Sequence, residues 1–338
     1  MKDFQFLILG HGLVGACLAS NLSMNNETFR VLHSEDKHCA SEKAAGLMNP
    51  VTGRRMALTW NHEILFPFAK NFYSKVWMHI HKEDGNFLSK RTIRKALHSI
   101  EEVNFLAAKS AWNGYSELIE IEENTNPQME IFNKLQSWAI TNDGARMNVP
   151  NFLFACRKNL ESAGKIILAD FEIEDLRKIK NGWEWKGSTF ENVVSCLGID
   201  CPWVGPELKP VKGQMYEFSG MPDWGQDILK TDKFMIPLEN GNVLAGSTYE
   251  RDVRNHILDE AGLEEVTSDL LPHIKQNLKL EKAWAGVRPT TLDRLPVIKK
   301  IEDNLFCING MGTKGVSLAP WAAQEIIRII KEEQEAKH

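Results

Sequence analysis

Residues 4–15 read FQFLILGHGLVG, and this stretch decides the fold. An apolar run of strand length passes directly into Gly10, Gly12 and Gly15, spaced as G-x-G-x-x-G. An Ala- and Leu-rich helix to about Asn25 follows, and then a second strand over Phe29–His33. In a dinucleotide-binding βαβ unit, the first glycine makes the tight turn and the second lets backbone approach a pyrophosphate. The third lets the helix pack on the strand, so the order of these segments predicts a nucleotide site.

The end of the second predicted strand departs from the usual nucleotide fingerprint. An acidic residue is expected there to bind the ribose hydroxyls, but the sequence has His33 followed by Ser34. Glu35 and Asp36 come just beyond. The imidazole of His33 can still hydrogen-bond a ribose, and a purely structural role for His33 stays open.

The same glycine spacing returns near the end of the sequence, at Gly310, Gly312 and Gly315. It follows an apolar strand over Leu305–Ile308 and precedes a helix from about residue 318 to 330, after which we expect the Lys- and Glu-rich segment to fray. No strand follows that would complete a second βαβ unit. Close approach of backbone to a flat or anionic group would explain these glycines.

Composition and charge limit the class of protein. The chain has 338 residues, 43% of them hydrophobic, which is enough for a large core and two domains. A formal net charge of −5 gives no general attraction to a polyanion, so we expect a small-molecule partner and no nucleic acid. Six scattered cysteines without a C-x-x-C pair predict no metal site and no disulfides. The composition gives no indication of oligomeric state.

No targeting or membrane-spanning segment is expected. The first apolar run lacks the basic flank of a signal peptide and is followed by glycines. No apolar run approaches the roughly 18 residues that a membrane span needs. We therefore expect a cytoplasmic protein with no membrane partner.

The middle of the chain changes from helices to strands. Apolar residues recur with helical period over His62–His81 and Ile100–Trp112, and a further helix is expected over Phe152–Ala163. From Ile166 onward, short apolar or alternating segments bounded by Gly, Pro and Asn predict strands. These lie at 193–197, 214–218, 233–237 and 243–245, ahead of a helical segment at 264–278, and together predict a β-rich second domain.

One segment concentrates positive charge, with Lys90, Arg91, Arg94 and Lys95 within six residues. A solvated face is the simpler interpretation. Contact with an acidic substrate or with RNA is the alternative, although the segment lacks the interleaved aromatic residues that stack on bases.

Several segments, in order, resemble the D-amino-acid-oxidase-like family of FAD-dependent oxidoreductases. This family includes glycine oxidase, sarcosine oxidase and the FAD domain of a bifunctional tRNA-modifying enzyme. The strongest resemblance is a G-x-R-P…D-x-x-P pattern followed by a glycine loop and a helix. The matching segments are Cys39–Leu47, Val193–Gly198, Lys212–Gln214, Leu244–Glu250, Gly286–Pro296 and Asn309–Pro320.

The resemblance implies an α/β fold with α+β elements: a Rossmann-like FAD/NAD(P)-binding domain and a second, antiparallel β-rich substrate domain. It implies a discontinuous FAD-binding domain of residues 1–82, 140–205 and 284–338, and a substrate domain of residues 83–139 and 206–283. The cofactor is then FAD. The residues expected to bind it are Gly10, Gly12, Leu13, Val14, Gly15, His33, Ser34, Ser41, Ala45, Gly46, Leu47, Ile173, Cys196, Gly198, Gly286, Arg288, Met311, Gly312, Thr313, Lys314, Gly315 and Val316.

The resemblance also implies the substrate residues. Arg288 occupies the position of a substrate-carboxylate arginine, whose planar fork suits bidentate recognition. Pairing of Arg288 with Asp293 or another carboxylate is the alternative. Lys314, in the glycine loop, is a second catalytic candidate, and the remaining substrate candidates are Tyr249, Asn49 and Arg54.

The activity implied is oxidation of the C–N bond of a small amine or amino acid by hydride transfer to flavin N5. No protein general base is required if the amine binds in its neutral form, because cofactor and geometry carry the chemistry. Two alternatives stay open: oxidative modification of an aminomethyl group on tRNA, and a non-catalytic FAD-binding subunit of a larger complex.

Overall fold

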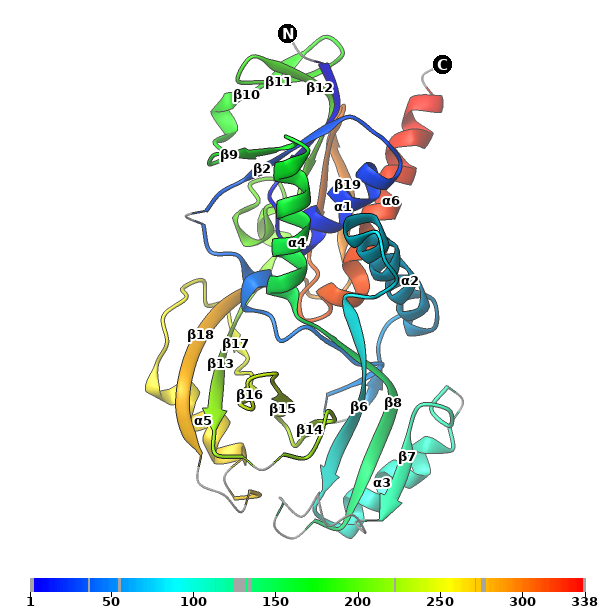
Figure 1. Cartoon of the computed structure of the whole chain (residues 1–338), viewed down its shortest axis with the longest axis vertical. Helices are drawn as coiled ribbons and strands as arrows, with labels where there is room; N and C mark the ends of the chain where they lie inside the picture. The colour runs from blue at the N-terminus through cyan, green and yellow to red at the C-terminus, as the bar shows by residue number, and fades with distance from the viewer. Residues whose placement is uncertain are drawn as a thin grey trace.

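The computed structural model describes residues 3–35, 37–53, 56–112, 114–123, 132, 135–221, 223–270, 272–274 and 278–336. Most of its strands form two large sheets, one in the upper and one in the lower half of Figure 1. A separate two-stranded hairpin consists of β4 (Val51–Thr52) and β5 (Ala57–Leu58).

The first sheet has a parallel centre in the order β9–β2–β1–β12–β20. The strand β19 extends it antiparallel to β20, and β10 and β11 add an antiparallel meander to β12. The bounds are β1 (Asp3–Leu9), β2 (Phe29–His33), β9 (Ile166–Leu168), β10 (Leu176–Ile179), β11 (Gly182–Trp185), β12 (Ser188–Ser195), β19 (Val297–Glu302) and β20 (Leu305–Asn309).

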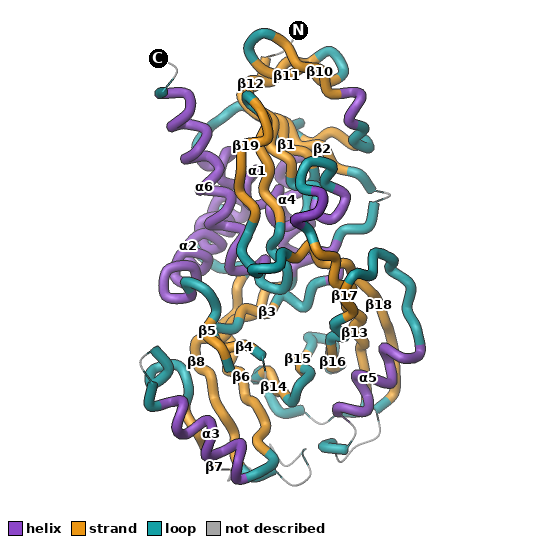
Figure 2. Tube along the Cα trace, turned by 180° about the vertical axis from the view of Figure 1, so that it is seen from behind, coloured by secondary structure: helices purple, strands orange, loops and turns teal. Residues whose placement is uncertain are grey.

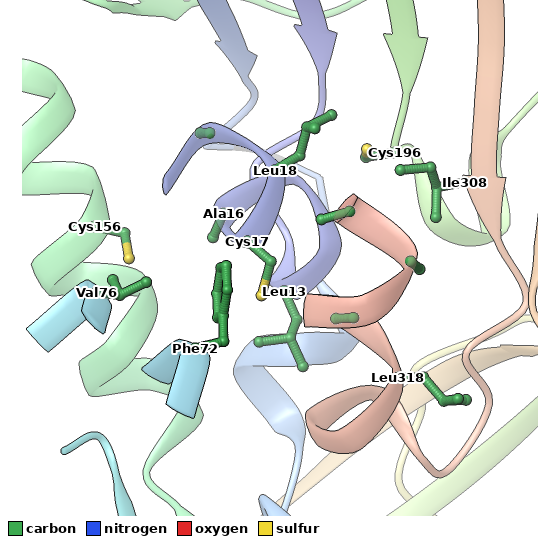
Figure 3. Packing of buried hydrophobic residues seen from close by; sticks show 14 of the residues in the cluster. Leu13, Ala16, Cys17, Leu18, Phe72, Val76, Cys156, Cys196, Ile308 and Leu318 are labelled. Carbon is green, nitrogen blue, oxygen red and sulfur yellow. The ribbon is translucent and has the colours of Figure 1, made fainter. Parts of the chain in front are cut away.

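Helices cover one face of this sheet, as Figures 1 and 2 show. Because successive strand residues face opposite sides, Phe6 and Ile8 contact the helices, whereas Leu7 and Leu9 face the β10–β11 side. The helices are α1 (Leu13–Met24), α2 (His62–His81), α4 (Val149–Ser162) and α6 (Gly315–Glu335). Figure 3 shows side chains of all of these helices in the same core, among them Cys17, Phe72, Cys156 and Leu318.

The second sheet has ten strands, and all of its pairs are antiparallel except β14 with β6. The strand order is β18–β13–β16–β15–β14–β6–β8–β3, with β17 beside β13 and β7 beside β8. The bounds are β3 (Leu47–Met48), β6 (Leu88–Leu97), β7 (Glu120–Glu123), β8 (Ser137–Met147), β13 (Lys209–Ser219), β14 (Ile228–Lys230), β15 (Phe234–Pro237), β16 (Val243–Gly246), β17 (Glu250–Arg251) and β18 (Lys279–Thr290).

The two faces of the second sheet have different partners. Trp138 and Leu229 face a core with α5 (Glu260–Leu270), which we call the outer side. Ile93, Met215 and Phe234 lie on the other side, the inner face, and pack with Ala45 and Leu47. The helix α3 (Ile100–Ser110) also belongs to this half of the molecule and packs beside β6 and β7. The predicted α/β fold, with a parallel nucleotide-type sheet and a second β-rich sheet, is confirmed.

Two of the predicted helices have different bounds in the structure. Helix α6 does not fray after residue 330 but continues to Glu335, because Lys300 of β19 pairs with Glu333 at 2.9 Å and Arg328 bridges acidic neighbours on the helix. Helix α5 spans Glu260–Leu270 instead of residues 264–278, and residues 272–274 are turn and bridge. It begins earlier because the Asp259 carboxylate accepts a hydrogen bond from the Gly262 N–H at 2.7 Å. None of the described helices is both long and apolar enough to cross a membrane.

Candidate active site

The first glycine motif is required by the protein's own packing at two of its three positions. Gly10 has φ +98°, and a Cβ there would lie 2.8 Å from the Cys196 carbonyl oxygen at the end of β12. A Cβ at Gly15 would lie 2.0 Å from the Gly10 carbonyl oxygen, so α1 sits directly against the turn. At Gly12 the nearest atom is the Ser41 hydroxyl at 3.4 Å. Gly12 therefore leaves backbone open to a ligand, as a pyrophosphate site requires.

The Ser- and Ala-rich turn lies against the start of α1. The Ser41 hydroxyl, on a 3-10 helix (Ala40–Lys43), accepts a hydrogen bond from the Leu13 N–H at 3.0 Å. Gly46 has φ +76°, and a Cβ there would lie 1.8 Å from the Met147 carbonyl oxygen of β8. Segment 41–46 thus connects the glycine turn to the second sheet.

The second glycine motif converges on the first. A Cβ at Gly315 would lie 3.2 Å from the Leu13 Cδ2, so α1 and α6 begin side by side (Figure 3). The Asn309 amide donates to the Gly198 carbonyl at 2.8 Å, which ties the ends of β20 and β12 together. The Gly312 N–H donates to the Pro289 carbonyl at 2.9 Å, beside Arg288. The structure therefore places two helix N-termini, with their positive dipole ends, at one location.

Two histidines beside the glycine turn have unmet hydrogen-bonding capacity. His11 and His33 are 2% and 7% exposed, with ring centroids 5.8 Å apart. Both ring nitrogens of His11 and the Nε2 of His33 lack a hydrogen-bond partner among the described atoms. Burial, and to a smaller extent the neighbouring His33, lowers the pKa of His11 to about 3. Burial, and to a smaller extent the charge of Arg157, lowers the pKa of His33. Both rings are neutral at neutral pH, and each can donate to or accept from a bound polar group.

A dinucleotide cofactor suits these residues. Buried polar groups in folded proteins are almost always hydrogen-bonded, so the free nitrogens of His11 and His33 point to a polar ligand at the turn. The Arg157 Nε is also buried without a partner in the described chain, while its Nη2 pairs with Glu42 at 3.0 Å. His11 and Arg157 were not among the predicted cofactor residues. The position of His11 between the first two glycines is the signal that could have identified it.

Arg288 lies on the inner face with half of its fork free. Its Nη2 donates to the Ser247 hydroxyl at 2.6 Å, whereas its Nη1 is buried and without a partner. A Cβ at Gly213 of the neighbouring strand would lie 2.2 Å from the Nη2, so this glycine makes room for the guanidinium. No carboxylate of the described chain pairs with Arg288, and Asp293 instead accepts the Leu295 N–H at 3.0 Å. The alternative in which Asp293 neutralises Arg288 is wrong.

Lys314 connects the second glycine loop to the β4–β5 hairpin. Its ammonium donates to the Thr59 hydroxyl at 2.6 Å and to the Thr52 hydroxyl at 3.4 Å. Burial first and Arg294 second lower the pKa of Lys314 to about 8. Val51 of the same hairpin packs with Leu97 on the inner face. The loop and the second sheet are therefore in contact through this hairpin.

The other predicted residues lie at different distances from these contacts. The Asn49 Oδ1 accepts the Val51 N–H at 3.0 Å, which uses part of its side chain in a turn. Tyr249 is 44% exposed and follows Ser247 by two residues. Ile173 lies in a 3-10 helix (Ile173–Asp175) after β9, and it is exposed. Arg54 lies outside the described residues. No group of three or more His, Cys, Asp or Glu residues with metal-site geometry occurs in the described part of the chain.

Comparison with known proteins decides the family. A family model described as "FAD dependent oxidoreductase" (DAO) matches residues 5–329. The chain belongs to the DAO family. This DAO protein is therefore an FAD-dependent enzyme.

Two relatives from Bacillus subtilis match nearly the whole length of this DAO protein at low identity. It is 24% identical to an uncharacterised oxidoreductase, YurR, of Bacillus subtilis over 96% of this chain and 94% of that one. It is 22% identical to glycine oxidase of Bacillus subtilis over 94% and 90% of the two chains. The crystal structure of glycine oxidase from Geobacillus kaustophilus matches with a TM-score of 0.81, 18% identity, and coverage of 98% and 95%. That structural likeness shows the fold.

Proposed function

We propose that this enzyme oxidises the C–N bond of a small amine or amino acid that carries a carboxylate. The observation that carries the proposal is the buried, unpartnered Nη1 of Arg288 beside a second glycine loop. A guanidinium held dry without a carboxylate leaves a charge uncompensated, which is costly unless a ligand supplies the anion. Relatives named glycine oxidase, and a structural neighbour named iminodiacetate oxidase at 16% identity, support an amino-acid type of substrate.

Arg288 would orient the substrate. Its outer nitrogens can form two parallel hydrogen bonds to a carboxylate, and the contact with Ser247 fixes the plane of the fork. Gly213 and Gly286, which face each other in the β13–β18 register, keep side chains out of this position. The α-carbon is thereby held in one orientation, and such positioning supplies much of the catalytic effect.

The second glycine loop would supply the electrostatic environment. Backbone N–H groups at the start of α6 favour negative charge, and the Lys314 ammonium adds a cation that is hydrogen-bonded to Thr59. When bound, FAD supplies the hydride acceptor at N5. The proposed residues at the cofactor are those of the two glycine turns, the 41–47 segment, and the His11–His33 pair.

An anaerobic screen of the purified holoenzyme tests the proposal. Amines and amino acids are added one at a time, and loss of the oxidised flavin absorbance is followed. We expect bleaching by at least one carboxylated amine and none by the corresponding hydroxy acid or by the same acid without its amine. A flavin that is bleached by hydroxy acids but by no amine would show that the bond oxidised is C–O, and the proposal would fail.

A further inference from the structure

The inner face of the second sheet carries a row of cations. In the β6–β14 register Lys95 lies directly opposite Lys230, and alternation along the strands places both on the side of Ile93, Ile228 and Phe234. Neighbouring strands lie about 4.8 Å apart, so the two lysines start from adjacent backbone positions, and the charge of Lys95 acts on Lys230. Like charges placed directly opposite each other destabilise a sheet. The protein keeps this arrangement on the face that also carries Arg288.

A second pair of like charges lies farther along the same face. Arg91 pairs with Gly144 and Arg146 pairs with Ser89, so the two arginines are diagonal neighbours on β6 and β8. The Arg146 Nε donates to the Ala45 carbonyl at 3.4 Å, within the segment proposed to contact the cofactor. Burial, and to a smaller extent the charge of Arg91, lowers the pKa of Arg146. Burial, and to a smaller extent the charge of Lys95, lowers the pKa of Lys230.

On the other side of the same strand carboxylates neutralise Arg94, but they do not neutralise these four cations. Arg94, between Ile93 and Lys95, is paired with Asp227 at 2.6 Å and with Glu122 at 3.3 Å. Arg91, Lys95, Arg146 and Lys230 form no ion pair with any described carboxylate. Asp232 and Asp269 raise the pKa of Lys230, and Glu239 raises that of Arg146, but each does so by less than burial and the neighbouring cation lower it. A group of partly buried cations without ion pairs in the described part of the chain, gathered on one face, is what an anion-binding surface requires.

The row of cations reaches toward the proposed active site. The residues Trp284, Met215, Gly246, Phe234, Lys230 and Lys95 follow one another across the sheet in register. Arg288 lies two inward-facing positions beyond Trp284 on β18. Lys230 is four strands from β18, on the order of 20 Å along the sheet, and Figure 1 shows the strands β14, β15 and β16 between the two sides.

We propose that the amine substrate carries, remote from the carboxylate at Arg288, a second anionic group of phosphate or carboxylate type that binds between Lys95 and Lys230, beside Arg91 and Arg146. This inference rests on the proposed amine oxidation. It makes the substrate an extended, multiply charged amine instead of a simple amino acid such as glycine.

A binding experiment tests the anion site independently of oxidation. The holoenzyme is titrated with inorganic pyrophosphate and with citrate, by calorimetry, at physiological salt. We expect the Lys95→Gln/Lys230→Gln double variant to bind at least one of them about tenfold or more weakly, as for loss of charge-assisted hydrogen bonds. Lys90→Gln, on the same strand but facing the opposite side and exposed, is the control for loss of a lysine charge and should bind like the wild type. Equal binding by all three proteins, or none at all by the wild type, would overturn the proposal.

A substrate series tests the link to catalysis and distinguishes the two anion types. The compounds are N-dodecylglycine, N-(11-carboxyundecyl)glycine and N-(10-phosphonooxydecyl)glycine, which are achiral and of matched length. We expect one charged compound to reduce the flavin at a concentration about tenfold lower than N-dodecylglycine does, and the double variant to remove that advantage. An advantage that survives in the double variant would contradict the proposal.

Two further outcomes are decisive. If no amine reduces the flavin while the anion titrations behave as expected, the oxidase proposal fails and the anion site stands by itself. If transfer RNA binds and Lys90→Gln weakens its binding as much as the double variant does, the cations form an RNA surface and the small-anion site is rejected.

Discussion

At the scale of single residues, the glycines of the first motif differ in what they must avoid. Gly10 has a positive φ, and a Cβ added there would lie 2.8 Å from the Cys196 carbonyl oxygen. Gly164 also has a positive φ, +62°, but a Cβ added there would have no atom within 4 Å. We expect Gly10→Ala to destabilise the protein by about 1–3 kcal/mol through strain and to abolish FAD retention. Gly164→Ala should cost about 1 kcal/mol and keep its flavin. Thermal unfolding and the flavin-to-protein absorbance ratio measure both, and retained flavin in Gly10→Ala would refute the expectation.

His11 makes the stability of the apoprotein depend on pH. Its pKa is about 3 in the folded chain against the usual 6.5, so the unfolded chain binds more protons between these values. The neutral His11 therefore adds to the free energy of unfolding above the pKa of the unfolded chain. This addition is lost as the pH falls, by about 2 kcal/mol between about pH 7 and about pH 5. Urea unfolding at the two pH values measures the loss. His11→Asn should show a smaller loss, and an unchanged one would exclude His11 as its source.

Residues were predictable from sequence where a local pattern fixes their role. Gly10, Gly12 and Gly15 are recognisable because turn, helix and strand lie within a few residues of one another. The partnerless state of His11 was not predictable, because it depends on burial by segments far away in the chain. The cations Arg146 and Lys230 were missed for a related reason: a bulge between Arg91 and Ile93 sets which side chains share a face.

At the scale of elements, Asn309 fastens β20 to β12 where the two glycine turns meet. Its amide donates to the Gly198 carbonyl, and its Oδ1 accepts the Gly310 N–H, each at 2.8 Å. We expect Asn309→Ala to destabilise the protein by about 1–3 kcal/mol, because buried partners lose their bonds, and to weaken FAD binding. Asn25→Ala, which removes an exposed side-chain hydrogen bond at the far end of α1, should leave FAD binding unchanged. Fluorescence titration of each apoprotein with FAD would contradict this if the two variants bound equally.

The helices and the parallel strands were predictable as elements, and several of the sheet partners were not. Periodicity placed α2 and α4 because 3.6-residue repeats are local. The pairing of β6 with β14, two strands 130 residues apart in register at Lys95 and Lys230, has no local signature. The short hairpin of β4 and β5, which joins Lys314 to the inner face, was not predicted as an element.

At the scale of the whole molecule, the proposed cofactor contacts come from both sheets. The Trp284 indole of the second sheet donates to the Lys43 carbonyl at 3.1 Å, next to the turn that caps α1. We therefore expect FAD to stabilise both sheets together, by about 2.7 kcal/mol when it is present at about 100 times its Kd. Calorimetry of the apoprotein should show one unfolding transition that moves to higher temperature with added FAD. Two transitions, of which FAD moves only one, would contradict joint stabilisation.

The central claim is that the free half of the Arg288 fork binds the carboxylate of an amine being oxidised. The most direct measurement is anaerobic flavin reduction by the most reactive amino acid and by its decarboxylated amine, in the wild type and in Arg288→Met. We predict that the wild type reaches half-saturation at a concentration of the acid about 100-fold lower than of the amine, as two charge-assisted hydrogen bonds imply. In Arg288→Met this preference should disappear. The same preference in both proteins would show that another group binds the carboxylate.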